Sequence, residues 1–533
     1  MASLRFGSRR SAVLARQGMV ATSQPLAAMA GLRALMDGGN AADAAVTTAA
    51  MLNVVEPMST GIGGDCFALV YKAASGRVSA MNGSGRAPAA FGLEEAQRLG
   101  LKEIPATGPL PVTVPGTVGG WEALLARFGT MSLGQCLAPA IATAEAGFPV
   151  SERVSAQWQA SVDKLSRDEA AARAYLPAPK PGQIRRQPEL AGIFRLVAEG
   201  GSDALYRGPL AERIAAAVQA KGGYLSPEDL ANHTTTWEAP IRTRYRDVEV
   251  VEHPPNGQGL AALLALNIVE GYDLAAMEYY DPQRWHVMIE AMRLGMVDAG
   301  RYITDPALTD VPVDGLLSAA YAERRRTLIE PDSALALAAP GQPKGSSTVY
   351  LTVVDGQGNA VSFINSLYSS SFGAGIVVPG TGIALQNRGA CFVLEPGHAN
   401  ALAGGKRPYH TIIPALALRD GELWLSFGVM GGFMQPQGHL QVIVNMVDYG
   451  LDAQAALDAP RFRVDQNGGP KVAFESAVPL KTRKALAAMG HQVERDVTFA
   501  PRFGGGQIIA RDAGTGVLWG GSDPRKDGCA IGY

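Results

Sequence analysis

The sequence predicts a mixed fold in which helices of small apolar residues pack against sheets joined by short turns. Three observations support this prediction. The 533-residue chain contains 63 glycines but only 15 phenylalanines and 15 tyrosines, a composition that suits close packing and many turns. Residues 41–54 are almost all small and apolar, and because this run is too short to span a membrane, we expect a central helix there. Residues 349–354 and 360–367 are β-branched or apolar, and the turn residues 356–359 between them are typical of a hairpin.

Local patterns place the other elements. Residues 25–38 are predicted to form a helix that stops at a Gly-Gly-Asn sequence. Residues 61–65 are predicted to form a tight turn in which glycines supply positive φ. A phosphate-binding loop is rejected there, because no Lys-Ser/Thr pair and no helix follow.

Residues 132–230 are mainly helical in pattern. Further strands are predicted over residues 66–72, 77–82, 245–252, 382–385, 411–418, 423–427 and 507–511, and further helices over residues 260–270, 282–301, 438–449, 453–456 and 480–489.

Composition narrows the class of protein. The net charge is -2 and no basic block is interleaved with aromatic residues, so no nucleic-acid partner is expected. No stretch is long enough to cross a membrane, and residues 1–17 lack the apolar core of a signal peptide, so a cytoplasmic location is expected. The cysteines and histidines show no metal-ligand spacing, and no structural disulfide is predicted. In the helix predicted over residues 282–301, His286, Glu290 and Arg293 are expected to face solvent.

The hairpin brings two hydroxyl groups together. If Asp355 faces Ala360 across the turn, counting back along the strands places Thr348 opposite Leu367, give or take one residue, and therefore beside Ser366. Two hydroxyls at the mouth of a buried hairpin suit a nucleophile with a hydrogen-bonding neighbour. Taken alone, Thr348 is more commonly an ordinary residue at the start of a strand, so the decision depends on the rest of the chain.

The segment before the hairpin has a different character. Residues 334–346 are rich in alanine, proline and glycine and have no periodicity, which predicts an exposed linker. This linker runs directly into a buried strand. A flexible segment attached to a rigid strand is what a precursor cleaved at their junction requires.

A series of motifs, in order along the chain, resembles one enzyme family. They occupy residues 38–45, 56–57, 61–65, 111–116, 270–274, 406–408, 431–432, 448–451, 459–462 and 522–525. Each motif alone is weak, but together they are similar to the γ-glutamyltranspeptidases and their relatives, which are N-terminal-nucleophile hydrolases. The resemblance runs from about residue 18 to the last residue.

The resemblance implies an α+β fold built as a four-layer αββα sandwich. It also implies self-cleavage between Ser347 and Thr348, because the Val-Val-Asp sequence at residues 353–355 matches the end of the family's nucleophile motif. The products would be a large subunit of residues 1–347 and a small catalytic subunit of residues 348–533. These two subunits are expected to form one intertwined globular domain, and a dimer of this heterodimer stays open.

The chemistry implied by the resemblance follows general principles. A threonine hydroxyl is a poor nucleophile without a base, and the α-amine of an N-terminal Thr348, with a pKa of about 7.7 to 8.0, can be that base. Before cleavage the same nitrogen is an amide, so the precursor should be inactive. By the resemblance, Ser366 orients the hydroxyl and the amine, and the backbone N–H groups of Gly431 and Gly432 form the oxyanion hole. No metal or organic cofactor is needed.

The chain departs from the glutamyl enzymes at the positions that hold the substrate's α-amino acid group. Cys391 matches the family aspartate that meets the α-amine, and Arg388 matches a glutamine; its guanidinium suits bidentate binding of a carboxylate. Pairing of Arg388 with a protein carboxylate such as Glu395 is equally consistent with the sequence. Cys391 also fits the description of a small buried filler. The remaining positions expected at the substrate are Tyr368, His410, Thr411 and, two residues beyond the position that matches a family arginine, Arg86.

These departures predict an amidohydrolase that acts on a small carboxylate-bearing amide without an α-amine. The pattern is similar to the branch of the family that includes oxamate amidohydrolase. The alternatives are a γ-glutamyltransferase or glutathione hydrolase, and an acylase of the glutaryl-cephalosporin type. A catalytically inactive scaffold is the hypothesis from another class, and the retained Ser347-Thr348 sequence counts against it.

Overall fold

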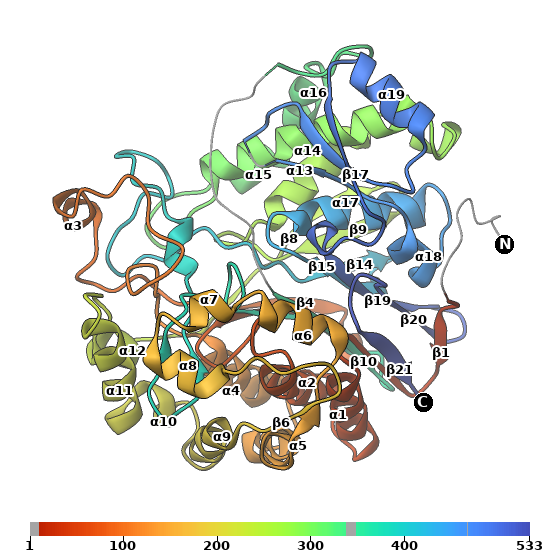
Figure 1. Ribbon diagram of the computed structural model, residues 1–533. Helices are drawn as coiled ribbons and strands as arrows, with labels where there is room; N and C mark the ends of the chain where they lie inside the picture. The colour runs from red at the N-terminus through yellow and green to blue at the C-terminus, as the bar shows by residue number, and fades with distance from the viewer. Residues whose placement is uncertain (1–9, 337–347, 466) are drawn as a thin grey trace.

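The computed structural model describes residues 10–336, 348–465 and 467–533. Two seven-stranded sheets pack face to face at the centre of the molecule, and helices cover the outer surface of each sheet (Figure 1). The architecture is a four-layer αββα sandwich of the α+β class, so the predicted fold class is confirmed.

The first sheet contains the predicted hairpin at its centre. Its strand order is β21-β2-β10-β11-β3-β4-β7, and neighbouring strands are antiparallel. Because β10 and β11 follow residue 348 whereas β2, β3, β4 and β7 precede it, the two parts of the chain are interleaved in this sheet. The strands are β2 (Gly18–Thr22), β3 (Asp65–Lys72), β4 (Arg77–Gly83), β7 (Thr236–Glu238), β10 (Val349–Asp355), β11 (Ala360–Ser366) and β21 (Cys529–Gly532).

The second sheet is also antiparallel and also combines both parts of the chain. Its order is β1-β20-β19-β15-β14-β9-β8. The single strand predicted over residues 245–252 is instead the end of β8 and all of β9, because the chain turns at Arg246, which has a φ of 55°. The strands are β1 (Val13–Ala15), β8 (Ile241–Tyr245), β9 (Val248–Glu252), β14 (Ala415–Arg419), β15 (Glu422–Met430), β19 (Gly505–Arg511) and β20 (Leu518–Ser522).

Smaller sheets lie outside this sandwich. One has three strands and two have two strands each. Their strands are β5 (Phe148–Pro149), β6 (Ile184–Arg185), β12 (Val377–Val378), β13 (Ile383–Ala384), β16 (Phe462–Val464), β17 (Lys471–Glu475) and β18 (Gln492–Asp496).

Helix α2 (Ala41–Val55) is the central helix that the sequence predicts. Every residue in it is buried, because its small side chains let it pack closely against β10 and β11 and against neighbouring helices. Asn40 caps its N-terminus by accepting hydrogen bonds from the backbone, and the Asp43 side chain accepts one from the Asn40 N–H in return. The other helices on this side of the molecule (Figure 1) are α1 (Pro25–Met36), α4 (Thr117–Phe128), α5 (Leu133–Ala146), α6 (Glu152–Gln159), α7 (Val162–Leu165), α8 (Glu169–Tyr175), α9 (Pro188–Gly200), α10 (Asp203–Tyr206), α11 (Gly208–Gln219) and α12 (Pro227–Ala231). Helix α3 (Leu93–Arg98) lies apart from them, at the left of the view.

The outer layer on the second sheet is built around α13 and α17, with α14 packed on α13. No helix in the described ranges combines the length and the apolar character needed to cross a membrane. The helices on this side are α13 (Gly259–Val269), α14 (Pro282–Tyr302), α15 (Val313–Leu316), α16 (Ala319–Arg326), α17 (Met434–Val447), α18 (Ala453–Asp458) and α19 (Leu480–Ala488).

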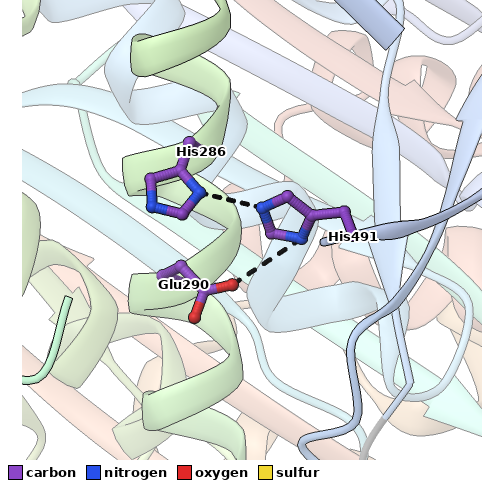
Figure 2. A group of neighbouring side chains, drawn as sticks. All are labelled: His286, Glu290 and His491. Carbon is purple, nitrogen blue, oxygen red and sulfur yellow. Dashed lines mark hydrogen bonds and ion pairs between the residues drawn. The ribbon is translucent and has the colours of Figure 1, made fainter. Parts of the chain in front are cut away.

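Helix α14 is buried on the side that the sequence predicts to be solvated. His286, Glu290 and Arg293 are at most 1% exposed, so that prediction is wrong. Glu290 pairs with Arg293 at 2.5 Å, and the ring of His491 faces both His286 and Glu290 from a neighbouring segment (Figure 2). His491 Nε2 lies 2.8 Å from His286 Nδ1, and His286 Nε2 donates to the carbonyl of Glu330 at 2.8 Å. These partners come from distant segments, which the helical pattern alone cannot reveal.

The glycines at residues 61–64 have a different role from the one predicted. None of Gly61, Gly63 and Gly64 has a positive φ. They allow close approach of the backbone instead, because a Cβ added to Gly64 would lie 2.3 Å from the carbonyl oxygen of Ser366. The turn therefore packs against the end of β11, and Asp65, which follows the turn, is paired with Ser366.

The hairpin register differs by one residue from the predicted register. Val354, rather than Asp355, pairs with Ala360. Continuing this register past the start of β10 places Thr348 opposite Ser366. The predicted proximity of the two hydroxyl groups is therefore unaffected by the shift.

Polar side chains connect β10 to the second sheet. Thr352 Oγ1 lies 2.5 Å from Ser426 Oγ on β15, and the Tyr350 hydroxyl lies 2.6 Å from Ser362 Oγ. Ser362 Oγ also accepts a hydrogen bond of 3.0 Å from the Ala415 N–H on β14. Because all these groups are buried, each needs its partner, and the set fixes β10 between the two layers.

Candidate active site

Thr348 and Ser366 lie side by side at the end of the central hairpin. Their hydroxyl oxygens are 3.0 Å apart, and both residues are buried. Ser366 Oγ also accepts a hydrogen bond of 2.8 Å from the backbone N–H of Tyr368. The backbone that follows Ser366 therefore fixes the serine hydroxyl while this hydroxyl contacts Thr348. Ser347, on the other side of the predicted cleavage site, lies outside the described residues.

The Gly431-Gly432 pair connects β15 to helix α17. Both glycines adopt positive φ, 126° for Gly431 and 61° for Gly432, a conformation that glycine adopts without strain. Gln258 holds this turn by donating a hydrogen bond of 2.8 Å to the carbonyl oxygen of Gly432. Within the described ranges, neither glycine N–H donates a hydrogen bond.

A cavity of about 270 Å³ opens beside Thr348. It reaches Gly431 on one side, and the cations Arg463, Arg502 and Lys526 contribute to its wall. Among the described residues that line it there is no carboxylate. The other lining residues are Gln157, Ser370, Met430, Pro501 and Gly504.

A second group of predicted residues surrounds a buried carboxylate, Asp65, which the sequence places only in a turn. Asp65 accepts hydrogen bonds from the Gly85 N–H at 3.0 Å and from Gln386 Nε2 at 2.8 Å. His410 Nε2 lies 2.9 Å from its other oxygen. Burial raises the pKa of Asp65 to about 7 and lowers the pKa of His410, so the histidine is neutral and donates its Nε2–H to the carboxylate.

Arg388 also belongs to this buried group. Its Nε lies 3.8 Å from Asp65, its Nη1 donates to Thr411 Oγ1 at 2.8 Å, and its guanidinium stacks on the Tyr368 ring at 4.1 Å. Arg388 is 0% exposed and does not line the cavity beside Thr348. The carboxylate near Arg388 is Asp65 rather than Glu395, and among the described residues Arg388 Nε and Nη2 have no hydrogen-bond partner.

The structure also places Cys391 and Arg86, two other residues that the sequence predicts at the substrate. Cys391 is buried, and burial raises the pKa of its thiol, so the thiol is uncharged at neutral pH. Arg86 pairs with Asp305 at 3.0 Å and donates to the carbonyl oxygen of Gly405 at 3.2 Å. Arg86 is not among the residues that line the cavity.

Sequence patterns give no indication of Lys164, which organises the loop after Tyr368. From helix α7 its ammonium donates to the carbonyl oxygens of Ser371 at 2.9 Å and Gly373 at 3.1 Å, and to Ser370. Residues 370–373 all have positive φ, between 39° and 58°, although only one of them is glycine. The lysine therefore stabilises an otherwise unfavourable loop that forms part of the cavity wall.

Comparison with known proteins shows which family this chain belongs to. The sequence model of the family described as Gamma-glutamyltranspeptidase matches residues 27–533. The chain belongs to this family. It is accordingly an enzyme of the N-terminal-nucleophile amidohydrolase type.

Curated and solved members of the γ-glutamyltranspeptidase family are similar to this chain over nearly its whole length. The glutathione hydrolase-like YwrD proenzyme of Bacillus subtilis is 38% identical, covering 98% of this chain and 99% of the relative. The oxamate amidohydrolase proenzyme of Klebsiella pneumoniae is 36% identical, covering 98% of this chain and 100% of the relative. The crystal structure of cephalosporin acylase from Bacillus halodurans superposes with a TM-score of 0.93 at 46% identity, covering 100% of this chain and 98% of that chain.

Removal of the Asp65 carboxylate is predicted to destabilise the protein strongly. Asp65→Ala leaves the Arg388 guanidinium buried without its counter-charge, so we expect a loss of about 3–5 kcal/mol in the free energy of unfolding. Thermal unfolding at pH 8, above the raised pKa of Asp65, measures this. The control is Asp247→Ala, which removes the partner of the exposed Arg419, 2.9 Å away, and should cost at most about 1 kcal/mol. Equal unfolding midpoints for the two variants would contradict the assignment.

Proposed function

We propose that the backbone is cleaved between Ser347 and Thr348, and that residues 1–347 and 348–533 stay together as one heterodimeric enzyme. Both curated relatives compared above are named proenzymes, which supports a processed chain. The interleaving of strands from both parts in each sheet supports the association of the products, because neither part could complete a sheet alone.

The nucleophile in this proposal is the Thr348 hydroxyl, and its base is the α-amine released by cleavage. With a pKa of about 7.7 to 8.0, this amine is partly unprotonated near neutral pH and takes the proton as Oγ attacks the substrate's amide carbon. Ser366, 3.0 Å from the nucleophile, orients it. The N–H groups of Gly431 and Gly432 would bind the oxyanion of the tetrahedral intermediate.

Completion of the reaction needs no further group in the proposal. The proton on the α-amine passes to the departing nitrogen as the C–N bond breaks, and an ester remains on Thr348. Water then attacks this ester with the α-amine again acting as base, and the acid product leaves. The single observation that carries the proposal is the Thr348–Ser366 pair at the wall of a cavity that Gly431 also lines.

For the substrate we propose a small amide that bears a carboxylate and lacks an α-ammonium group, with oxamate as the simplest example. A cavity of about 270 Å³ suits a small molecule. Its described wall contains cations and no carboxylate, so an ammonium-bearing substrate finds no counter-charge among these residues. An acylase of the cephalosporin type is the second candidate, favoured by the 46% identity to a protein of that name. A γ-glutamyl substrate is the least compatible with this wall.

The variant Thr348→Ala tests the nucleophile. It removes the hydroxyl, so we expect a single 55.8 kDa chain on a denaturing gel and no amide hydrolysis. The matched variant Thr348→Ser keeps the hydroxyl and should give two chains, with residue 348 found as a new N-terminus by mass spectrometry. Two chains from the alanine variant would contradict the proposal.

A substrate panel tests the acyl group. With processed protein, we expect kcat/KM for oxamate or for glutaryl anilides to exceed that for the γ-glutamyl anilide by about 10-fold or more, because an unpaired ammonium beside cations costs at least 1–2 kcal/mol. Steady-state kinetics under identical conditions give the comparison. A γ-glutamyl anilide turned over as fast as the others would show that the substrate assignment is wrong.

A further inference from the structure

The loop that follows Ser366 has an unfavourable backbone conformation close to the nucleophile. Four residues of this loop have a positive φ although none of the four is glycine, and they are Tyr368 (76°), Ser370 (53°), Ser371 (39°) and Phe372 (58°). A residue with a Cβ rarely adopts this conformation, because the Cβ lies too close to a carbonyl oxygen. Residues 368–373 therefore keep it only because contacts from the rest of the protein hold them.

Lys164, on helix α7, holds the part of the loop around Ser370. Its ammonium donates hydrogen bonds to the carbonyl oxygens of Ser370, Ser371 and Gly373, at 2.9 Å for Ser371 and 3.1 Å for Gly373. Ser370 Oγ lies 3.0 Å from the same nitrogen. Carbonyl oxygens that converge on one point repel one another, so this conformation of the loop depends on a cation at that point.

The Lys164 side chain is fixed by packing and is charged near neutral pH. A Cβ added to Gly375 would lie 2.9 Å from Lys164 Cγ, so the stem of the lysine lies against the backbone that continues from the loop. Burial, and to a smaller degree the charge of Arg167, lowers the pKa of Lys164 to about 8. At pH 7 most molecules therefore carry the ammonium that the loop requires.

The far end of the loop has an anchor that does not depend on Lys164. The Phe372 ring packs against Tyr175 and Trp158, with ring centroids 4.7 Å and 5.6 Å away. The Phe372 N–H also donates to the carbonyl oxygen of Met58 at 2.7 Å. Loss of the lysine is therefore expected to release the part of the loop around Ser370 while the rest of it stays in place.

The part of the loop that Lys164 holds is connected directly to the nucleophile. The Tyr368 N–H donates to Ser366 Oγ at 2.8 Å, and Ser366 Oγ lies 3.0 Å from Thr348 Oγ1. Ser370, two residues beyond Tyr368, lines the cavity beside Thr348. A shift of the loop would therefore turn the Ser366 hydroxyl away from the nucleophile.

We propose that Lys164 is a positioning residue for amide hydrolysis. Its ammonium holds residues 368–373 in the strained conformation that keeps the Ser366 hydroxyl on Thr348. This inference rests on the proposed function of Thr348 as nucleophile. Because Lys164 precedes the proposed cleavage site and the loop follows it, residues 1–347 would in this way set the geometry of the part of the chain that carries the nucleophile.

Neutral variants of Lys164 test this role in processed protein at pH 7, with the substrate of the panel above that wild-type protein hydrolyses fastest. Lys164→Met removes the charge and the donors but keeps a stem of similar length, so we expect kcat to fall about tenfold or more while KM changes less than about threefold. Lys164→Arg keeps a cation with donors and should restore most of the rate. The matched control is Lys180→Met, which removes an exposed lysine that does not line the cavity and should leave kcat unchanged.

A cycle of double variants separates positioning of Ser366 from a general structural role. If Lys164 acts through Ser366, Lys164→Met should lower the kcat of Ser366→Ala protein by less than about twofold, because the hydroxyl that the lysine positions is already absent. An equal loss of about tenfold in both backgrounds would overturn the proposal. A kcat of Lys164→Met equal to that of wild type would overturn it as well.

Thermal midpoints and the state of the chain complete the test. If Lys164→Met lowers the midpoint, Lys164→Gln, which keeps an amide donor without the charge, replaces it with the same expected loss of kcat. A Lys164→Arg variant as slow as Lys164→Met at an equal midpoint would also contradict the proposal. All rates are divided by the fraction of chains with Thr348 as N-terminus. Wild-type protein that never cleaves, or hydrolysis by Thr348→Ala, would instead contradict the function of Thr348 as nucleophile.

Discussion

Pairing of β10 with its neighbours fixes where the Thr348 hydroxyl lies, and the rest of the site is arranged around that point. The strand is buried on both faces, with α2 on one side and the second sheet on the other. A slip of one residue would turn apolar side chains toward the polar contacts between the sheets, so the register is strongly specified. Ser366 is adjacent because β11 runs back along the same strand.

Charge is distributed around this fixed point in two ways. Behind Thr348, Asp65 lies 3.8 Å from Arg388 Nε and accepts hydrogen bonds from His410 and Gln386. In front of it, Arg463, Arg502 and Lys526 line a cavity whose described wall contains no carboxylate. The first arrangement stabilises the fold, and the second leaves positive charge for a ligand.

Local patterns in the sequence were sufficient for the hairpin, for α2 and for the proximity of Thr348 and Ser366, since each depends on neighbours within about twenty residues. They failed where partners are remote. His286 lies against His491 and Glu330, and Arg388 pairs with a carboxylate more than 300 residues earlier, so neither environment could be inferred from a helix face or a nearby glutamate. Lys526 directly follows a family motif, but its place in the cavity depends on tertiary packing.

The central claim is that the hydroxyl gains its base only when the peptide bond before Thr348 breaks. The most direct measurement takes freshly purified chain at intervals and records two quantities, the fraction of molecules with Thr348 as N-terminus, by mass spectrometry, and the rate of amide hydrolysis. The account predicts a rate proportional to that fraction and passing through zero when the chain is intact. Hydrolysis at the full rate by uncleaved chain would contradict it.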